Sequence, residues 1–201
     1  MNQIKILKPF IPKNSIELVL KCLNKWEVVI KLSSKRHTKH GDFRILPNGI
    51  RQISINKTEN IYRFLITLIH ELSHMVAYEK YGPKIKPHGY YWKKTYADLI
   101  KPFLINSIFP KNLLHILFEH FKSPKASSDS DFDLSLALKE FDKSDGRKYI
   151  FELQRGSLFE IYNGRKFKLS EKKVKRYRCE ELNSKKVYLF SAHAKVTPLD
   201  I

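Results

Sequence analysis

The stretch Thr58–Tyr81, with the sequence TENIYRFLITLIHELSHMVAYEKY, has the strongest helical pattern in the chain. Gly82-Pro83 follows it directly and predicts the end of a helix, because glycine caps helices and proline cannot continue them. Asn56, followed three residues later by Glu59, predicts a capping-box start. The middle of this helix holds HELSH at residues 70–74, an HExxH pattern. Residues four apart share one helix face, so both imidazoles can reach a single metal ion.

A third metal ligand must come from elsewhere in the chain, because two histidines leave a zinc ion under-coordinated. His88 is the candidate that we favour, since it opens the next predicted helix after a Gly-Pro turn. A helix that folds back would bring His88 toward the metal, and Gly89 would relieve crowding there. His115 and His120 are alternatives on a later helix with apolar neighbours. Glu79 lies too close along the same helix to close the site.

The predicted site has the chemistry of a hydrolase. The expected ligands of one Zn²⁺ per chain are His70, His74 and His88. Zinc lowers the pKa of a bound water, and a neighbouring carboxylate can take the proton and pass it to a leaving amine. Glu71 is therefore the candidate catalytic residue. Tyr90, Tyr91 or another donor could stabilise the oxyanion, and the sequence does not choose among them.

Charge is unevenly spread along the 201 residues. The chain has 38 Lys and Arg against 20 Asp and Glu, a formal net charge of +18, which favours polyanionic partners. Residues 1–57 hold 12 basic and 3 acidic groups, residues 58–146 hold 12 and 11, and residues 147–201 hold 14 and 6. Two basic flanks around a nearly neutral middle suggest that chemistry and polyanion contact are divided between regions.

Cysteine content and hydropathy exclude several classes of protein. Cys22 and Cys179 are the only cysteines, so neither a disulfide framework nor a CxxC zinc site can form. Residues 1–14 contain no apolar signal segment, and no stretch approaches the roughly 20 apolar residues of a membrane span. We therefore expect a cytoplasmic protein, with nucleoid association as one option, and no membrane partner.

The remaining pattern predicts an α+β body followed by a small antiparallel β appendage. Helices are expected at residues 14–25, 89–101 and 110–121, with strands at 27–32, 42–46 and 51–55. The polar run SPKASSDSD at 123–131 predicts a linker before a helix-like segment at 131–142. Short β-like runs then follow at 149–151, 158–162, 165–169 and 187–190, with Asn163-Gly164 as a turn. The predicted domains are 1–122, a linker and short helix at 123–146, and a basic β-rich unit at 147–201.

Two motifs, HELSH at residues 70–74 and HGYYW at residues 88–92, are separated by thirteen residues. Together they resemble the SprT-like (Spartan) metalloprotease domain. The run KHGDFR at 39–44 also resembles that family's strand entry, and the resemblance covers roughly residues 13–122. It implies a zincin-like α+β fold with His70, His74 and His88 as zinc ligands and Glu71 as catalytic base. The best-known members degrade proteins crosslinked to DNA. The resemblance thus implies a zinc-dependent endopeptidase that acts on DNA-associated or DNA-crosslinked proteins.

The C-terminal part departs from the family pattern. Many relatives end in a four-cysteine zinc ribbon, whereas this tail keeps only Cys179. We expect a degenerate, ribbon-like β unit that folds without metal, as in a bacterial-type member. The long tail of eukaryotic relatives is also missing, so recruitment to replication machinery is not implied.

The tail contains a candidate nucleic-acid surface. Its basic residues are Arg165, Lys166, Lys168, Lys172, Lys173, Lys175, Arg176 and Arg178. Phe167 and Tyr177 alternate with them, and cations with stacking rings are typical of sequence-tolerant single-strand binding, to DNA or to RNA. The alternative is a solvated charged face over aromatic core residues. For the whole chain, the rival functions are a nucleic-acid-binding protein with a structural zinc and a zinc-dependent nuclease.

Overall fold

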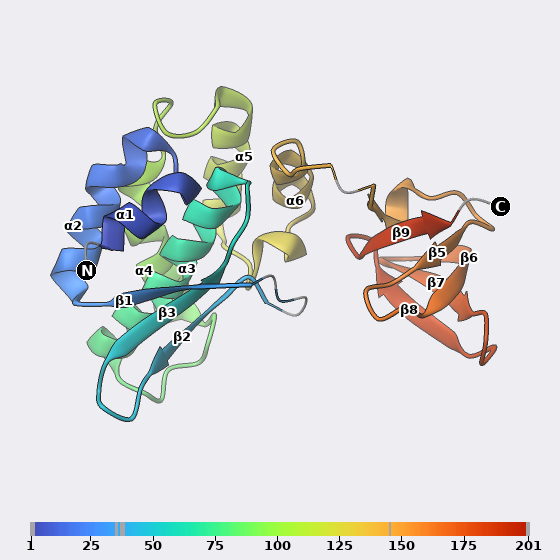
Figure 1. The fold of residues 1–201 in the computed structure, drawn as a ribbon, viewed down its shortest axis with the longest axis horizontal. Helices are drawn as coiled ribbons and strands as arrows, with labels where there is room; N and C mark the ends of the chain where they lie inside the picture. Colours follow the sequence, from blue (N-terminus) through green and yellow to red (C-terminus); the bar gives the residue numbers. More distant parts are fainter. Residues whose placement is uncertain (1–2, 35, 37–38, 145, 200–201) are drawn as a thin grey trace. The chain divides into compact units, whose positions relative to one another are not determined.

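The computed structural model describes residues 3–34, 36, 39–144 and 146–199, and the chain divides into two units (Figure 1). Unit 1 is Met1–Asp142 and unit 2 is Lys143–Ile201. Unit 1 combines helices with a three-stranded sheet, and unit 2 is an antiparallel sheet. The predicted α+β class is confirmed. Among the described residues, no helix combines the length and apolarity needed to cross a membrane.

The sheet of unit 1 has the order β1-β3-β2. β1 (Val29–Ser33) runs parallel to β3 (Arg51–Asn56), and β2 (Gly41–Ile45) runs antiparallel to it. The predicted hairpin therefore forms. Its turn is closed by a hydrogen bond of 2.9 Å from the Leu46 amide to the Ile50 carbonyl, with Gly49 at a φ of 80°. β2 lies at an edge of the sheet, which leaves one side of that strand open.

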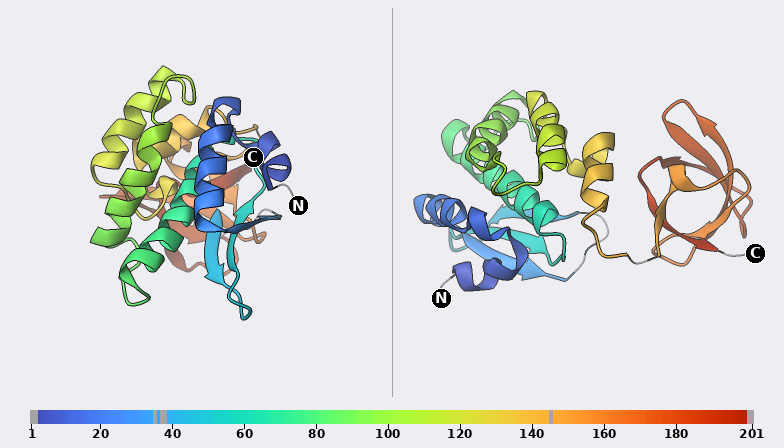
Figure 2. Two further views of the ribbon diagram at one scale, coloured as in Figure 1. Left: turned by 90° about the vertical axis from the view of Figure 1, so that its left-hand side faces the viewer. Right: turned by 90° about the horizontal axis from the view of Figure 1, so that it is seen from above.

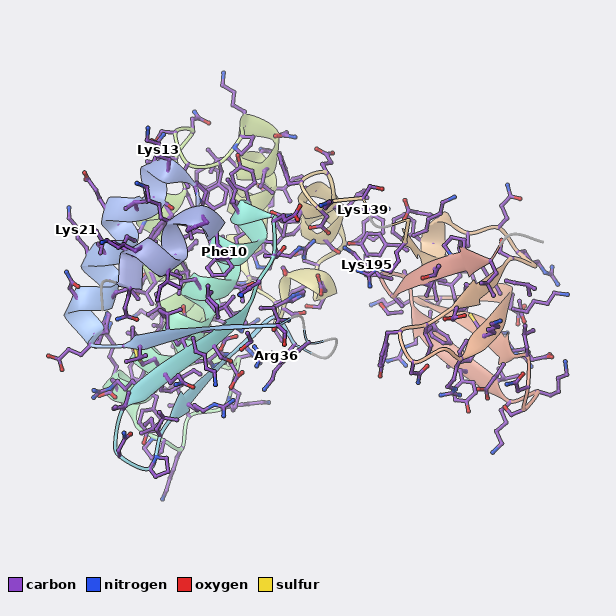
Figure 3. All side chains as sticks on the ribbon, viewed as in Figure 1. Phe10, Lys13, Lys21, Arg36, Lys139 and Lys195 are labelled. Atoms are coloured by element: carbon purple, nitrogen blue, oxygen red, sulfur yellow. The ribbon has the colours of Figure 1, made fainter. Side chains whose placement is uncertain are left out.

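Helix α3 (Ile61–Tyr81) is the centre of unit 1. It contacts β2 and β3 on one side and α4 (Tyr90–Ile100) on the other, so it lies between the sheet and a helical layer (Figures 1 and 2). The remaining helices are α1 (Gln3–Leu7), α2 (Ile16–Trp26), α5 (Lys111–Lys122) and α6 (Phe132–Lys139). Most of the α3 side chains are buried, and Phe10 stacks on Phe64 of this helix with ring centroids 5.3 Å apart (Figure 3).

The sequence pattern predicts the C-terminal end of α3 correctly but not its N-terminal end. The Gly82 amide donates to the Tyr78 carbonyl at 2.8 Å, so the predicted glycine stop is confirmed. The predicted Asn56 and Glu59 start is wrong, because the N-cap is Asn60, whose side chain accepts from the Arg63 amide at 2.9 Å. Asn56 is instead the last residue of β3. Its side-chain amide donates to the carbonyls of Arg36 and Lys39, in the segment before β2.

The helix predicted at 131–142 forms as α6, but the predicted linker at 123–131 is wrong, because residues as far as Asp142 belong to unit 1. Asp129 and Asp142 both pair with the buried Arg63 of α3, at 2.9 and 3.3 Å. Asp142 also accepts from the Asn60 side chain at 2.7 Å. In a sequence, a serine- and aspartate-rich run is typical of a solvated linker, and nothing local in it indicates a distant buried arginine.

Unit 2 contains one six-stranded sheet in the order β4-β9-β5-β6-β7-β8, with antiparallel pairing throughout. The strands are β4 (Lys148–Tyr149), β5 (Leu158–Glu160), β6 (Lys166–Lys173), β7 (Arg176–Glu181), β8 (Val187–Ser191) and β9 (Lys195–Leu199). The hydrophobic cluster at its core consists of Ile150, Phe159, Phe167, Leu169, Cys179 and Val196. The predicted Asn163-Gly164 turn joins β5 to β6, with Gly164 at a φ of 80°. β7 and β9 were not predicted, because their charged or proline-containing segments lack the apolar alternation of a typical strand.

Removing a side chain from α6 tests whether the segment after residue 123 is part of unit 1. Leu138 is completely buried, and Leu138→Ala should lower the free energy of unfolding by about 2–5 kcal/mol. Leu136 on the same helix is 39% exposed, and Leu136→Ala should stay within about 0.5 kcal/mol of wild type. Urea denaturation of both variants measures the difference. Equal stabilities would show that α6 is an appended linker helix after all.

Candidate metal centre

Three histidine side chains converge at one point of unit 1. His70 and His74 come from one face of α3, and His88 comes from the loop that precedes α4. Their Nε2 atoms are 3.2 Å apart for His70 and His74, 3.0 Å for His74 and His88, and 3.4 Å for His70 and His88. Each imidazole thus presents the same ring nitrogen to a common centre.

This spacing fits the donor set of a zinc ion. Bonds of about 2.0–2.1 Å in a tetrahedral site place neighbouring nitrogens about 3.3 Å apart. The observed Nε2 separations of 3.0–3.4 Å correspond to that triangle. In the described part of the chain, this trio is the one group of three or more His, Cys, Asp or Glu side chains close enough to share a metal ion.

His88 owes its position to an unusual local backbone. Its φ of 57° lies in the left-handed region, which few residues other than glycine adopt. The next residue, Gly89, is the N-cap of α4, and a Cβ there would lie 2.9 Å from the Lys86 carbonyl oxygen. Gly89 therefore relieves crowding against Lys86 in the turn, and not at the metal as the sequence pattern predicted.

An aromatic layer supports the three imidazoles. The buried Trp92 ring lies 4.6–5.1 Å from the centroids of all three histidine rings, and Tyr96 lies 5.4 Å from His70. Burial, followed by the neighbouring imidazoles, lowers the pKa of His70 to about 2 and that of His74 to about 4. Burial also lowers the pKa of His88. All three rings are therefore neutral at pH 7, the form in which imidazole binds a metal.

Glu71 is buried beside the start of β2. A Cβ at Gly41 would lie 2.8 Å from the Glu71 Cγ and 2.9 Å from its Oε1, so only glycine leaves room for this carboxyl group. Burial, followed by repulsion from Asp42, raises the pKa of Glu71 to about 8, against the opposing effects of Arg36, Lys39 and the Phe43 amide. A cation at the histidine cluster would lower that pKa again and favour the carboxylate.

Asp42 anchors a polar network at the same end of β2. It accepts hydrogen bonds from Ser54 and from Arg36 (Figure 3), and from Arg44 at 2.7 Å. Burial acts to raise the pKa of Asp42, but these hydrogen bonds and that of Lys39 outweigh it and hold the pKa well below its usual range. The network fixes the strand next to Glu71. The KHGDFR run contains Gly41, Asp42 and Lys39, but its spacing alone does not indicate which of them faces Glu71.

The cluster opens into a cleft of about 680 Å³ within unit 1. Its walls are the start of β2, the inner face of α3, the loop 83–88 and the turn 126–129. His70, Glu71, His74 and His88 all line it. The turn 126–129 was predicted as linker and is instead held at the cleft by Asp129, which pairs with Arg63 and with His40.

The rival ligands lie elsewhere. His115 is exposed on α5, and His120 pairs with Asp131 at 2.8 Å. Glu79 pairs with Arg51 at 2.6 Å. Tyr90 and Tyr91, named above as oxyanion donors, are exposed and do not line the cleft, whereas Tyr78 and Tyr96 do.

The tail residues predicted to bind nucleic acid are exposed, with the exception of Arg165, which is half-buried. Lys166, Lys168, Lys172, Lys173, Lys175, Arg176 and Arg178 are exposed on β6, β7 and their turn. Glu171 pairs with Lys173 at 3.0 Å and with Arg178 at 3.6 Å. Arg165 is bound to Glu181 at 2.6 Å and covers the ring of Tyr188 at 4.7 Å.

The aromatic half of that prediction is wrong for Phe167. Phe167 is completely buried, and Tyr177 packs against the core of unit 2. Phe167 is therefore not available to stack on bases, whereas Tyr177 is half-buried. The side chains alternate across the first half of β6, so Lys166 and Lys168 face solvent while Phe167 and Leu169 face inward.

Comparisons of this chain with protein-family models, with curated proteins and with solved structures find no match in any of the three. The resemblance to the SprT-like family therefore rests on the motif residues alone.

Zinc analysis of two histidine variants tests the site. We expect one zinc per wild-type chain, and His88→Ala should lose most of it, because two imidazoles bind zinc weakly. His115→Ala removes an exposed imidazole of α5 and should keep full zinc content. Elemental analysis after dialysis gives the stoichiometry. Full occupancy in His88→Ala, or two zinc ions per wild-type chain, would contradict this assignment.

Proposed function

We propose that this chain is a zinc-dependent endopeptidase of the SprT-like class, with a zincin-like fold in residues 1–122. The observation that carries the proposal is that the buried Glu71 carboxyl lines the same cleft as the three converging imidazoles. His70, His74 and His88 would hold the ion. The strained backbone at His88 supports this role, because strain is retained where a side chain must have one position.

Each residue has a separate task in the proposed reaction. Zinc would supply Lewis-acid activation of water and of the scissile carbonyl. Glu71 accepts a proton from the attacking water and returns it to the leaving amine. Gly41 leaves space for that carboxyl group and the Phe43 amide hydrogen-bonds to it, so the base is held in place before substrate binds. The 680 Å³ cleft offers space for a stretch of polypeptide.

An open site favours catalysis over a structural zinc. A structural zinc is usually enclosed by four protein ligands, whereas a catalytic zinc keeps one position free. No fourth His, Cys, Asp or Glu of the described residues joins the trio, and all three imidazoles line the cleft. A structural site would also have no use for a buried carboxyl group. The alternative of a non-enzymatic nucleic-acid-binding protein is therefore second, and a nuclease assay separates a zinc-dependent nuclease from both.

The proposed substrates are DNA-associated or DNA-crosslinked proteins. The family resemblance suggests this class, and the net charge of +18 supports contact with a polyanion. The exposed lysines and arginines of β6 and β7 are candidate phosphate contacts. Arg165, Lys173 and Arg178 are the weaker candidates, because Glu181 and Glu171 pair with them.

Replacement of Glu71 tests the mechanism. Glu71→Gln keeps the shape of the side chain but cannot accept a proton, so cleavage should fall by about 10² to 10⁴. Zinc content should stay at the wild-type level. A protease assay on a denatured model protein, with and without single-stranded DNA, measures the loss. Undiminished cleavage by the variant would exclude Glu71 as the base.

Gly41→Ala tests the positioning of that base. The added methyl group must push the Glu71 carboxyl away from its place, and a displacement of this kind can cost about 10²-fold in rate. We expect reduced cleavage with unchanged zinc content, because Gly41 does not touch the imidazoles. If cleavage equals wild type, the close approach of β2 to Glu71 has no role in catalysis.

A further inference from the structure

Three tyrosines form an exposed cluster at the junction of α3 and α4. Tyr81 ends α3, and Tyr90 and Tyr91 begin α4. Tyr81 and Tyr91 stack with ring centroids 4.5 Å apart, and Tyr90 meets Tyr91 edge to face at 5.5 Å. Tyr90 is 72% exposed, Tyr91 49% and Tyr81 41%. We call these three residues the tyrosine platform.

The platform is not part of the core of unit 1. The buried face of α4 is formed by Trp92, Thr95, Tyr96 and Ile100, whereas Tyr90 and Tyr91 point away from it. The three rings therefore contact one another in solvent. An exposed group of aromatic rings is typical of a binding surface, because such rings lose little conformational freedom when a partner covers them.

The platform lies in a strongly basic segment. Residues 80–94 contain no Asp or Glu and five lysines, namely Lys80, Lys84, Lys86, Lys93 and Lys94. Lys93 is half-buried and the other four are exposed. Within the part of the chain that the structure describes, none of the five forms an ion pair, in contrast to Lys173 and Arg178 of unit 2.

Nearby acidic residues do not cancel this charge. Glu79 precedes the segment, and its carboxylate is engaged by Arg51 at 2.6 Å. Asp98 is exposed one turn beyond Lys94 on α4. The surface around the rings therefore has an excess of cations, and charge complementarity favours an anionic occupant.

We propose that the tyrosine platform and its lysines bind single-stranded nucleic acid. Unpaired bases stack on Tyr90 and Tyr91, and the lysines of residues 80–94 contact the phosphates. Exposed rings flanked by cations are the two components of sequence-tolerant single-strand binding. In unit 2, Phe167 is buried and Tyr177 is half-buried, so the rings that alternate with the cations of its sheet offer less stacking surface than the tyrosine platform.

The platform adjoins the metal centre along the chain. The loop between Tyr81 and Tyr90 contains Pro83, Ile85, Pro87 and His88, all of which line the cleft. A strand on the platform would therefore lie next to the cleft, on the same unit. The site adds a nucleic-acid partner to the proposed peptidase, and its test does not depend on peptidase activity.

Binding of a labelled oligothymidylate 20-mer to the full chain, measured by fluorescence anisotropy, tests the proposal. The double replacement Tyr90→Ala and Tyr91→Ala should weaken binding roughly 10- to 100-fold, since stacking contributes strongly for each base. The matched double replacement by Phe should retain most of the affinity. Because both side chains are exposed, thermal melting should be unchanged.

An abasic strand of the same length separates stacking from charge. It should bind wild type more weakly than the thymidylate strand does, and it should not distinguish wild type from the double alanine variant. Replacement of Lys84, Lys86 and Lys94 by Gln should make the slope of log affinity against log salt shallower, by about 0.7 for each phosphate that the variant no longer neutralises. An oligouridylate 20-mer with ribose, compared with the deoxyribose thymidylate strand, reports whether RNA or DNA is preferred.

Two controls separate this proposal from the proposed function and from the tail. Glu71→Gln should bind the oligonucleotide like wild type, whatever its effect on cleavage. The combined replacement of Lys172, Lys173, Lys175 and Arg176 should not abolish the difference between thymidylate and abasic strands. If the double alanine variant binds the thymidylate strand as tightly as wild type, the platform is not a nucleic-acid site, and a protein partner becomes the occupant to seek.

Discussion

The convergence of three neutral imidazoles on one point is the constraint on which the rest of the structure depends. Bringing three Nε2 atoms within 3.0–3.4 Å of one another requires that none of the rings carries a proton charge. Burial of α3 between the sheet and α4 supplies this condition, and the aromatic layer under the rings keeps water from their far side. The loop from Gly82 to Gly89 then connects α3 to α4 and brings His88 to the other two imidazoles.

The sheet contributes the second half of the site through one close approach. β2 passes so near α3 that residue 41 can only be glycine, and the Asp42 network holds the strand at that distance. Glu71 is thereby enclosed by a strand that comes from a different part of the sequence. The segment around Asp129 closes the other end of the cleft, because its carboxylate satisfies the buried Arg63. Helix, strand and turn are thus joined by polar contacts of Asp42 and Asp129, which both line the cavity.

Much of this arrangement follows from local sequence pattern, and the remainder depends on long-range pairing. The HELSH helix, its Gly82 stop, the hairpin and His88 were predictable because each depends on spacing or turn chemistry over a few residues. The place of residues 123–142 was not, because the partners of Asp129 and Asp142 lie more than sixty residues away. The net charge summed over residues 58–146 also concealed a local cationic segment. The middle region is nearly neutral on average, yet residues 80–94 are all cationic or uncharged. In the tail, alternation along β6 buries Phe167, a ring that the sequence places between two lysines.

The X-ray absorption spectrum at the zinc edge of the purified full chain tests the central claim most directly, because it reports the ligands themselves. The account predicts three imidazole nitrogens and one further light atom at about 2.0–2.1 Å, with no sulfur. A sulfur shell at about 2.3 Å, or fewer than three imidazoles, would contradict it, since Cys22 and Cys179 have no place in a centre formed by His70, His74 and His88.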